Sequence, residues 1–109
     1  MKAPIRIGIV GMGGFAASHH HAIARLEDRG VAQLVCTCDP QLDSFVGEQT
    51  AWRLATRGVR VFHDYRTMLE TCHRDLDVVV LPTPIQLHAE MHAAATFYGL
   101  PTYLEKPPS

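Results

Sequence analysis

Apolar and polar residues alternate along this chain in blocks that predict a regular succession of strands and helices. Short apolar runs, rich in β-branched residues, predict strands over 5–10, 31–39, 59–62, 78–81 and 100–104. Between them, apolar residues at helical spacing predict helices over 15–29, 43–57, 65–72 and 85–98. The run from Val78 to Leu81 is wholly apolar, which is typical of a central parallel strand covered by helices on both faces.

This succession predicts an α/β fold in which a doubly wound parallel sheet lies between two layers of helices. The first strand ends in a glycine-rich turn, which favours the Rossmann-like strand order 3-2-1-4-5. On the second strand we expect Cys36 and Cys38 to share one face, and Val35, Thr37 and Asp39 to share the other. Asp64 is expected to cap the helix that follows it.

The turn after the first strand has the spacing G-x-G-x-x-A, in which Gly11, Gly13 and Ala16 are the small residues. Gly11 permits the sharp turn, Gly13 permits close approach to a pyrophosphate, and Ala16 permits tight packing of helix on strand. The free N–H groups of the helix then face the phosphates. The cofactor-binding residues predicted here are Gly11, Met12, Gly13, Gly14 and Phe15. The alternative is a glycine-rich turn that binds nothing.

Asp39 ends the second strand, at the distance from the turn where a dinucleotide-binding fold places an acid for the ribose 2′-hydroxyl. Pro40 and Gln41 follow it, and no arginine or lysine stands close behind to receive a 2′-phosphate. A carboxylate would also repel that phosphate. The cofactor we expect is therefore NAD, with NADP disfavoured. The alternative reading of Asp39 is an ordinary turn or N-cap residue.

The carboxyl ends of the fourth and fifth predicted strands bring further polar residues to the same sheet edge. Those predicted to lie beside the cofactor are Thr83, Pro84, His88, Glu105 and Lys106. Lys106 could donate a hydrogen bond to a substrate hydroxyl or carbonyl, or act as an acid or base, and is the catalytic candidate. The alternatives are a solvated lysine and, for His88, an ordinary residue near a helix N-terminus.

Histidines suggest metal binding at two places, and neither is favoured. His19, His20 and His21 are adjacent on a helix and point about 100° apart, so we expect polar helix positions near the mouth of the pocket. His88 and His92 have a spacing that suits zinc, but the sequence shows no third ligand. We expect no metal site.

Composition narrows the class of partner and compartment. The chain has 109 residues, 47% of them apolar, and a net charge of −1, which suits one globular domain and argues against nucleic acid as a partner. It has no apolar stretch long enough to span a membrane, and from its first residues we expect no signal peptide. Three cysteines without zinc-like spacing suggest reduced, buried thiols in a cytoplasmic protein.

Five segments taken in order resemble the Gfo/Idh/MocA oxidoreductases: GIVGMGGFAASHH, CDP, DYRTMLE, DLDVVVLPTPIQLHAEMHAAA and YLEKP. The resemblance implies an N-terminal NAD(P)-binding Rossmann domain of an enzyme that oxidises or reduces sugars, cyclitols or related small alcohols and carbonyls. It matches Asp39 to the adenosine-ribose acid, and His88 to the loop beside the nicotinamide. It also places Lys106, within the E-K-P motif completed by Pro107, near nicotinamide and substrate.

The sequence departs from the family pattern at two points. Ile85 replaces the usual asparagine of the loop after the fourth strand. The chain also ends just after E-K-P, so residues 1–109 are expected to be a Rossmann domain incomplete at its carboxyl end, without the substrate domain and inactive alone. We expect it to form a homo-oligomer through the apolar surface of its last strands. Two alternatives are a non-catalytic NAD-binding or sensing module and, disfavoured by the E-K-P motif, a methyltransferase that uses S-adenosylmethionine.

Overall fold

Strands and helices alternate along the chain as the apolar pattern predicts. The computed structural model describes residues 3–82 and 85–104. The strands are β1 (Ile5–Val10), β2 (Ala32–Cys38), β3 (Arg60–Phe62), β4 (Val78–Leu81) and β5 (Thr102–Leu104). The α-helices are α1 (Phe15–Asp28), α2 (Val46–Ala51), α3 (Tyr65–Cys72) and α4 (Ile85–Phe97), and 3₁₀ turns cover Leu42–Phe45 and His73–Asp75. In this described part of the chain, no helix has the length and apolar character needed to cross a membrane.

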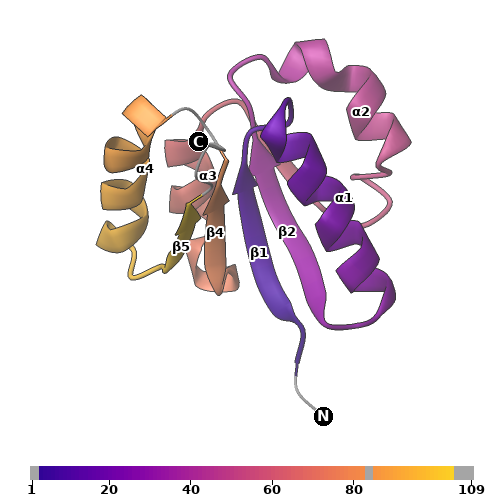
Figure 1. Cartoon of the computed structure of the whole chain (residues 1–109), viewed down its shortest axis with the longest axis horizontal. Coiled ribbons are helices and arrows are strands. Elements are labelled where there is room, and N and C mark those ends of the chain that lie inside the picture. Colours follow the sequence, from indigo (N-terminus) through magenta and orange to yellow (C-terminus); the bar gives the residue numbers. More distant parts are fainter. Residues whose placement is uncertain (1–2, 83–84, 105–109) are drawn as a thin grey trace.

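The strands form one parallel sheet in the order β3-β2-β1-β4-β5, which confirms the predicted Rossmann topology (Figure 1). Because all the strands are parallel, their carboxyl ends meet at one edge of the sheet. The chain leaves β1 at this edge and turns directly into α1 (Figure 1). The glycine-rich turn and the end of β2 therefore become neighbours.

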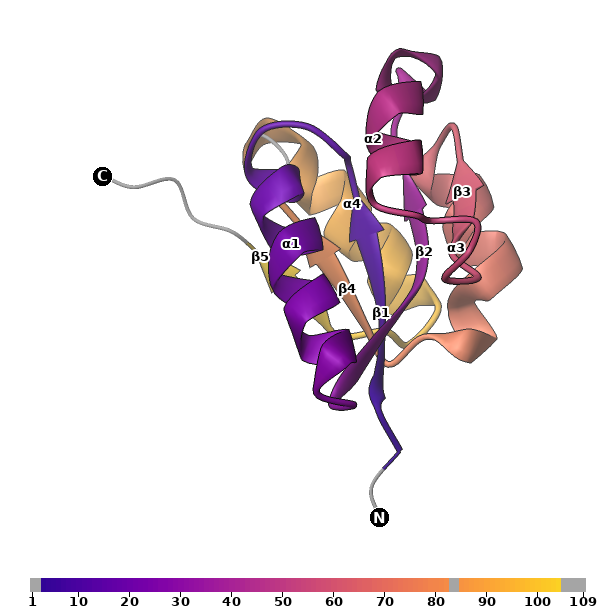
Figure 2. The ribbon, with the colours of Figure 1, turned by 90° about the vertical axis from the view of Figure 1, so that its right-hand side faces the viewer.

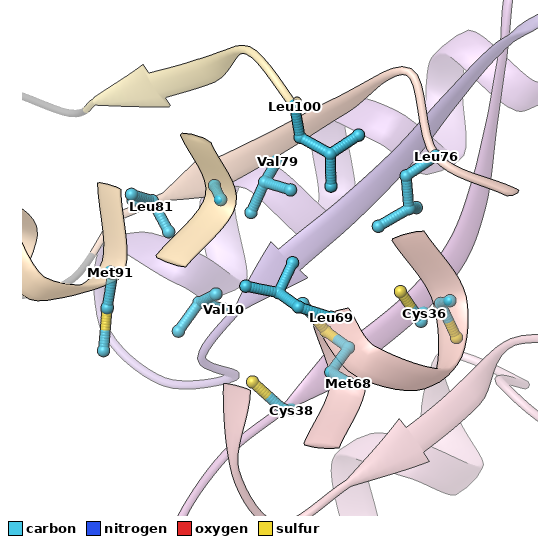
Figure 3. Packing of buried hydrophobic residues seen from close by; sticks show 12 residues of the cluster. Val10, Cys36, Cys38, Met68, Leu69, Leu76, Val79, Leu81, Met91 and Leu100 are labelled. Atoms are coloured by element: carbon cyan, nitrogen blue, oxygen red, sulfur yellow. The ribbon is translucent and has the colours of Figure 1, made fainter. Parts of the chain in front are cut away.

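Helices cover both faces of the sheet, with α1 on one side and α3 on the other (Figure 2). The core under α3 and α4 includes Met68, Leu69, Met91 and Val79, seen in Figure 3. The core on the opposite face lies under α1 and the segment around α2, and includes Ile9, Met12, Ile23, Leu34 and Leu54. The three-layer architecture predicted from the sequence is confirmed.

A β-bulge in β2 changes which residues face each core. Ile7 pairs with Leu34, but the next residue, Gly8, pairs with Cys36, so Val35 has no partner on β1. Leu34 therefore packs under α1, whereas Val35 and Cys36 both pack on the α3 side. The prediction that Val35 shares a face with Thr37 is wrong, because strict alternation cannot register an extra residue.

The second predicted helix, over 43–57, is much shorter than expected. A 3₁₀ turn precedes α2, and α2 itself has only six residues. Arg53 adopts a left-handed conformation, with φ of 52°, and this ends the helical path after Trp52. The irregular segment that follows carries Leu54 into the core and leaves Trp52 against α1.

The third helix begins as predicted, at an aspartate cap. Asp64 Oδ1 accepts a hydrogen bond from the Thr67 N–H at 2.9 Å, and Asp64 Oδ2 accepts one from the Thr67 hydroxyl at 2.8 Å. These bonds, the backbone bond first, lower the pKa of the Asp64 carboxyl below its ordinary value. The cap fixes the start of α3, which forms one wall of the core in Figure 3.

Candidate functional site

The turn between β1 and α1 requires glycine at two positions for backbone reasons. Gly11 has φ of 106° and Gly14 has φ of 59°, conformations that L-residues with a side chain rarely adopt. The Gly11 N–H donates to the Cys38 carbonyl at 2.6 Å, which ties the start of the turn to the end of β2. Gly13 and Gly14 are exposed, so their backbone is accessible to a ligand.

Gly13 lies close to an aromatic side chain, a contact that the sequence did not reveal. A Cβ atom at this position would lie 3.0 Å from Cζ of Phe45. The aromatic ring, contributed by the 3₁₀ turn before α2, thus packs directly against the backbone of the turn. A side chain at position 13 would crowd this ring, which would have to move by a few tenths of an ångström.

The N-terminus of α1 is open to an anion. Gly14 is the N-cap residue and offers no capping side chain, and the first turn of α1 contains no acidic residue. The positive end of the helix dipole is therefore not neutralised by the helix itself. The structure brings this end together with the glycine turn, as predicted for a phosphate-binding site.

Asp39 lies beside the turn, as predicted, and its carboxylate contacts it directly. Oδ2 accepts a hydrogen bond from the Met12 N–H at 3.0 Å, and Oδ1 accepts one from the Gln41 N–H at 2.8 Å. A carboxylate oxygen can accept more than one hydrogen bond, so both oxygens retain capacity for ligand hydroxyls. Asp39 is half-buried, and its side chain joins the end of β2 to the phosphate turn.

The three adjacent histidines occupy three different environments, and the expectation of three polar positions near the pocket mouth is wrong for His20. His20 is only 1% exposed and lies beneath the turn, with its Nε2 atom 3.2 Å from the Gly11 carbonyl oxygen. The His19 ring contacts Tyr103 of β5 edge-on, and His21 is exposed beside Trp52. His20 shares the inner face of α1 with Ala16 and Ile23 at helical spacing, and this was the available signal.

Several predicted site residues lie outside the described residues: Thr83, Pro84, Glu105, Lys106 and Pro107. The backbone of Phe15 and His88 lies in α1 and α4, but their side chains are not described. His92 Nδ1 lies 2.7 Å from the Thr102 hydroxyl, which links α4 to β5. Within 3–82 and 85–104, no group of three or more metal-binding side chains comes together.

The cysteines belong to the core and not to the site. Cys36, Cys38 and Cys72 are all free and buried. Burial raises the pKa of the Cys38 thiol to about 12, and burial together with the nearby Cys72 raises that of Cys36. These two thiols are therefore protonated at neutral pH and are poor nucleophiles and metal ligands.

A doubly wound parallel sheet, an open glycine turn at the first strand end and an acid at the second define a dinucleotide-binding Rossmann domain. Residues 5–109 match the family described as an oxidoreductase family with an NAD-binding Rossmann fold, Gfo/Idh/MocA. The chain belongs to this family. The resemblance found in the motifs, and the NAD cofactor class that it implies, are thus confirmed at the level of the family.

Relatives of known identity are longer than this chain. Inositol 2-dehydrogenase 4 of Saccharopolyspora erythraea is 34% identical over 103 residues, which cover 94% of this chain and 28% of that protein. The WlbA dehydrogenase of Bordetella pertussis, solved with NADH and UDP-GlcNAcA, superposes with a TM-score of 0.80 at 31% identity over 97% of this chain and 29% of its own. Biliverdin reductase from Synechocystis, solved with biliverdin and NADP+, has a TM-score of 0.70 at 28% identity over 95% and 30%. The chain therefore spans less than a third of each relative.

Proposed function

We propose that this domain binds NAD in a dehydrogenase that acts on a sugar, a cyclitol or a related small alcohol or carbonyl compound. One observation carries the choice of cofactor. The Asp39 carboxylate is held against the turn by the Met12 N–H, at the strand end where a ribose hydroxyl is recognised in this fold. The same negative charge disfavours a ribose 2′-phosphate, and therefore NADP.

The described residues fit a dinucleotide. The exposed backbone of Gly13 and Gly14 and the uncapped N-terminus of α1 would receive the pyrophosphate, and Asp39 would accept hydrogen bonds from the adenosine ribose. NAD, when bound, accepts or supplies a hydride. We assign Lys106 the hydrogen bond to the reacting oxygen of the substrate, on the strength of its E-K-P motif alone.

The substrate class is supported by the relatives. The sequence relative is named as an inositol dehydrogenase, and the Bordetella structure contains a nucleotide-linked sugar. Inositol and the sugar of UDP-GlcNAcA are both polyhydroxylated rings. A nicotinamide cofactor can oxidise a carbon that carries such a hydroxyl group. Biliverdin reductase departs from this class, so the domain alone does not set the substrate.

Calorimetric titration with NAD, and separately with NADP, tests the cofactor assignment. We expect NAD to bind this chain and NADP to bind more weakly, because Asp39 repels the extra phosphate. Gly14→Val is the variant expected to weaken NAD binding, because φ of 59° at this position disfavours a β-branched residue. A side chain here would not contact the core, so the fold should be kept. Absence of binding by either dinucleotide, in a chain that circular dichroism shows to be folded, would contradict the proposal.

We also propose that the chain associates with itself through β5. This strand is the last in the described sheet, and Tyr103 on it is 54% exposed. Tyr103→Lys is expected to lower the sedimentation coefficient at a given concentration, because a charge on an edge strand opposes pairing. Phe97→Lys, at an exposed apolar residue of α4, is the control and should leave the sedimentation coefficient unchanged. A wild-type chain that sediments as a monomer would refute this association.

A further inference from the structure

Two buried polar side chains lie beneath the glycine turn. Among the described residues, only His20 and Thr37 are polar and buried, at 1% and 0% exposure. They come from α1 and β2, and His20 Nε2 lies 3.3 Å from Thr37 Oγ1. Polar groups in a core are costly unless they are hydrogen-bonded, so the partners of this pair show what it does.

The hydrogen bonds fix the protonation of the His20 ring. The Thr37 hydroxyl has one hydrogen, and its shortest acceptor is the Ile9 carbonyl at 2.9 Å, against 3.4 Å for the Gly11 carbonyl. The remaining neighbours of His20 Nε2 are then acceptors, the Gly11 carbonyl at 3.2 Å and the Thr37 oxygen. Nε2 must therefore carry the hydrogen and donate it.

The other side of the ring confirms that Nε2 is the useful atom. His20 Nδ1 is buried and has no hydrogen-bond partner in the described structure. The ring stacks on Trp52, with centroids 4.5 Å apart. Arg57 holds Trp52 in place by donating from Nη1 to its carbonyl at 2.9 Å and from Nε to Glu27 of α1 at 2.8 Å. An apolar residue would avoid the unpartnered Nδ1, so the Nε2 bond is what a histidine adds.

The Nε2 bond acts on one particular peptide group. The carbonyl of Gly11 and the N–H of Met12 belong to the same planar unit. His20 holds its oxygen from within the core, and Asp39 Oδ2 holds its N–H at 3.0 Å. Hydrogen bonds at both its oxygen and its N–H oppose rotation of this peptide group. Its oxygen stays directed into the protein, away from the negative phosphates that the turn receives.

We propose that His20 is a positioning residue for the dinucleotide site, which fixes the Gly11–Met12 peptide through its Nε2–H and so holds the glycine turn in its binding conformation. This role rests on the proposed function for its benefit to ligand binding, but the restraint on the turn is present in the free protein. It assigns a function to a residue that touches no ligand. Thr37 assists by orienting the imidazole.

Two variants separate the donor from the volume of the side chain. His20→Leu removes the donor, and His20→Gln keeps an N–H at nearly the same distance from the backbone. His21→Leu, at the exposed neighbour, is the matched control. We expect His20→Leu to speed amide exchange at Met12 in the free chain and to weaken NAD binding about tenfold, the loss of one hydrogen bond. His20→Gln should restore both, and His21→Leu should change neither.

Failure of the proposed function can be distinguished from failure of the positioning role of His20. If the wild-type chain binds neither dinucleotide, the proposed function fails, while Met12 exchange in the free chain still decides the positioning role. Equal exchange and equal NAD affinity in folded His20→Leu and wild type would overturn it. Should His20→Leu not fold, ¹⁵N spectra of the wild-type imidazole decide: hydrogen on Nε2 supports the assignment, and hydrogen on Nδ1 overturns it.

Discussion

Replacing Asp39 with alanine is expected to weaken NAD binding by about 10- to 100-fold, the usual effect of losing hydrogen bonds to a charged group. The carboxylate serves two purposes, because it holds the Met12 N–H and would accept the ribose hydroxyls. Binding of NADP should fall less, or even improve, because the repulsion of its 2′-phosphate disappears. Calorimetric titration with both dinucleotides measures the two effects together.

Two further variants identify which property of Asp39 matters. Asp39→Asn keeps an oxygen for the Met12 N–H but removes the charge, so it should relax the discrimination against NADP more than it weakens NAD. Asp43→Ala removes an equal charge from a side chain that is 96% exposed and forms an ion pair with His63, and should leave both affinities unchanged. If Asp39→Ala bound NAD as tightly as wild type does, and NADP as tightly as wild type does, the proposed role of this residue would be refuted.

The second large effect is a loss of folding stability in acid. Burial, aided by the charges of Arg57, His21 and His19, lowers the pKa of His20 from 6.5 to about 4, while its bond to the Gly11 carbonyl opposes the shift. As pH falls below 6.5, the unfolded chain takes up a proton that the folded chain refuses until about pH 4. The free energy of unfolding should thus fall by about 3 kcal/mol between pH 7 and pH 4 through His20 alone. Below pH 4 both states are protonated, and this loss stops.

Urea unfolding at a series of pH values, for wild type and His20→Gln, isolates this contribution. The carboxyls of Asp64, Asp77 and Glu90 have lowered pKa values and also lose stabilising interactions in acid. Both proteins share these groups, so the difference between the two curves belongs to His20. Curves that run parallel from pH 7 to pH 4 would show that His20 does not carry the acid sensitivity.

The sequence was sufficient to predict most of the fold, for local reasons. Period-two and helical spacing located the strands and helices, and the glycine turn selected the strand order. Asp39 was predicted at the turn because strand ends in a parallel sheet meet at one edge. Helix 43–57 was overestimated, because nothing in the local pattern reports that Arg53 turns left-handed.

The supports of the site were harder to predict, because they depend on contacts between distant segments. Phe45 reaches Gly13 from 32 positions further along the chain, a separation that no local pattern encodes. His20 belongs to a run of polar residues, but its spacing from Ala16 and Ile23 places it on the inner face of α1. Adjacent identical residues on a helix do not share an environment, and helical periodicity, more than residue type, indicates which of them is buried.

The bulge in β2 leaves Val35 without a partner on β1, so the sheet can lose this residue without inverting any neighbour. Leu34 and Cys36 pair with consecutive residues of β1, so deleting Val35 would leave a regular strand with Leu34, Thr37 and the cysteines on their present faces. Deleting an interior residue other than Val35 or Cys36 would turn part of the strand over. Differences in length among related chains are therefore expected to concentrate at this point of the strand. The residues of β2 before the bulge and those after it, which lead to Asp39, can then vary separately.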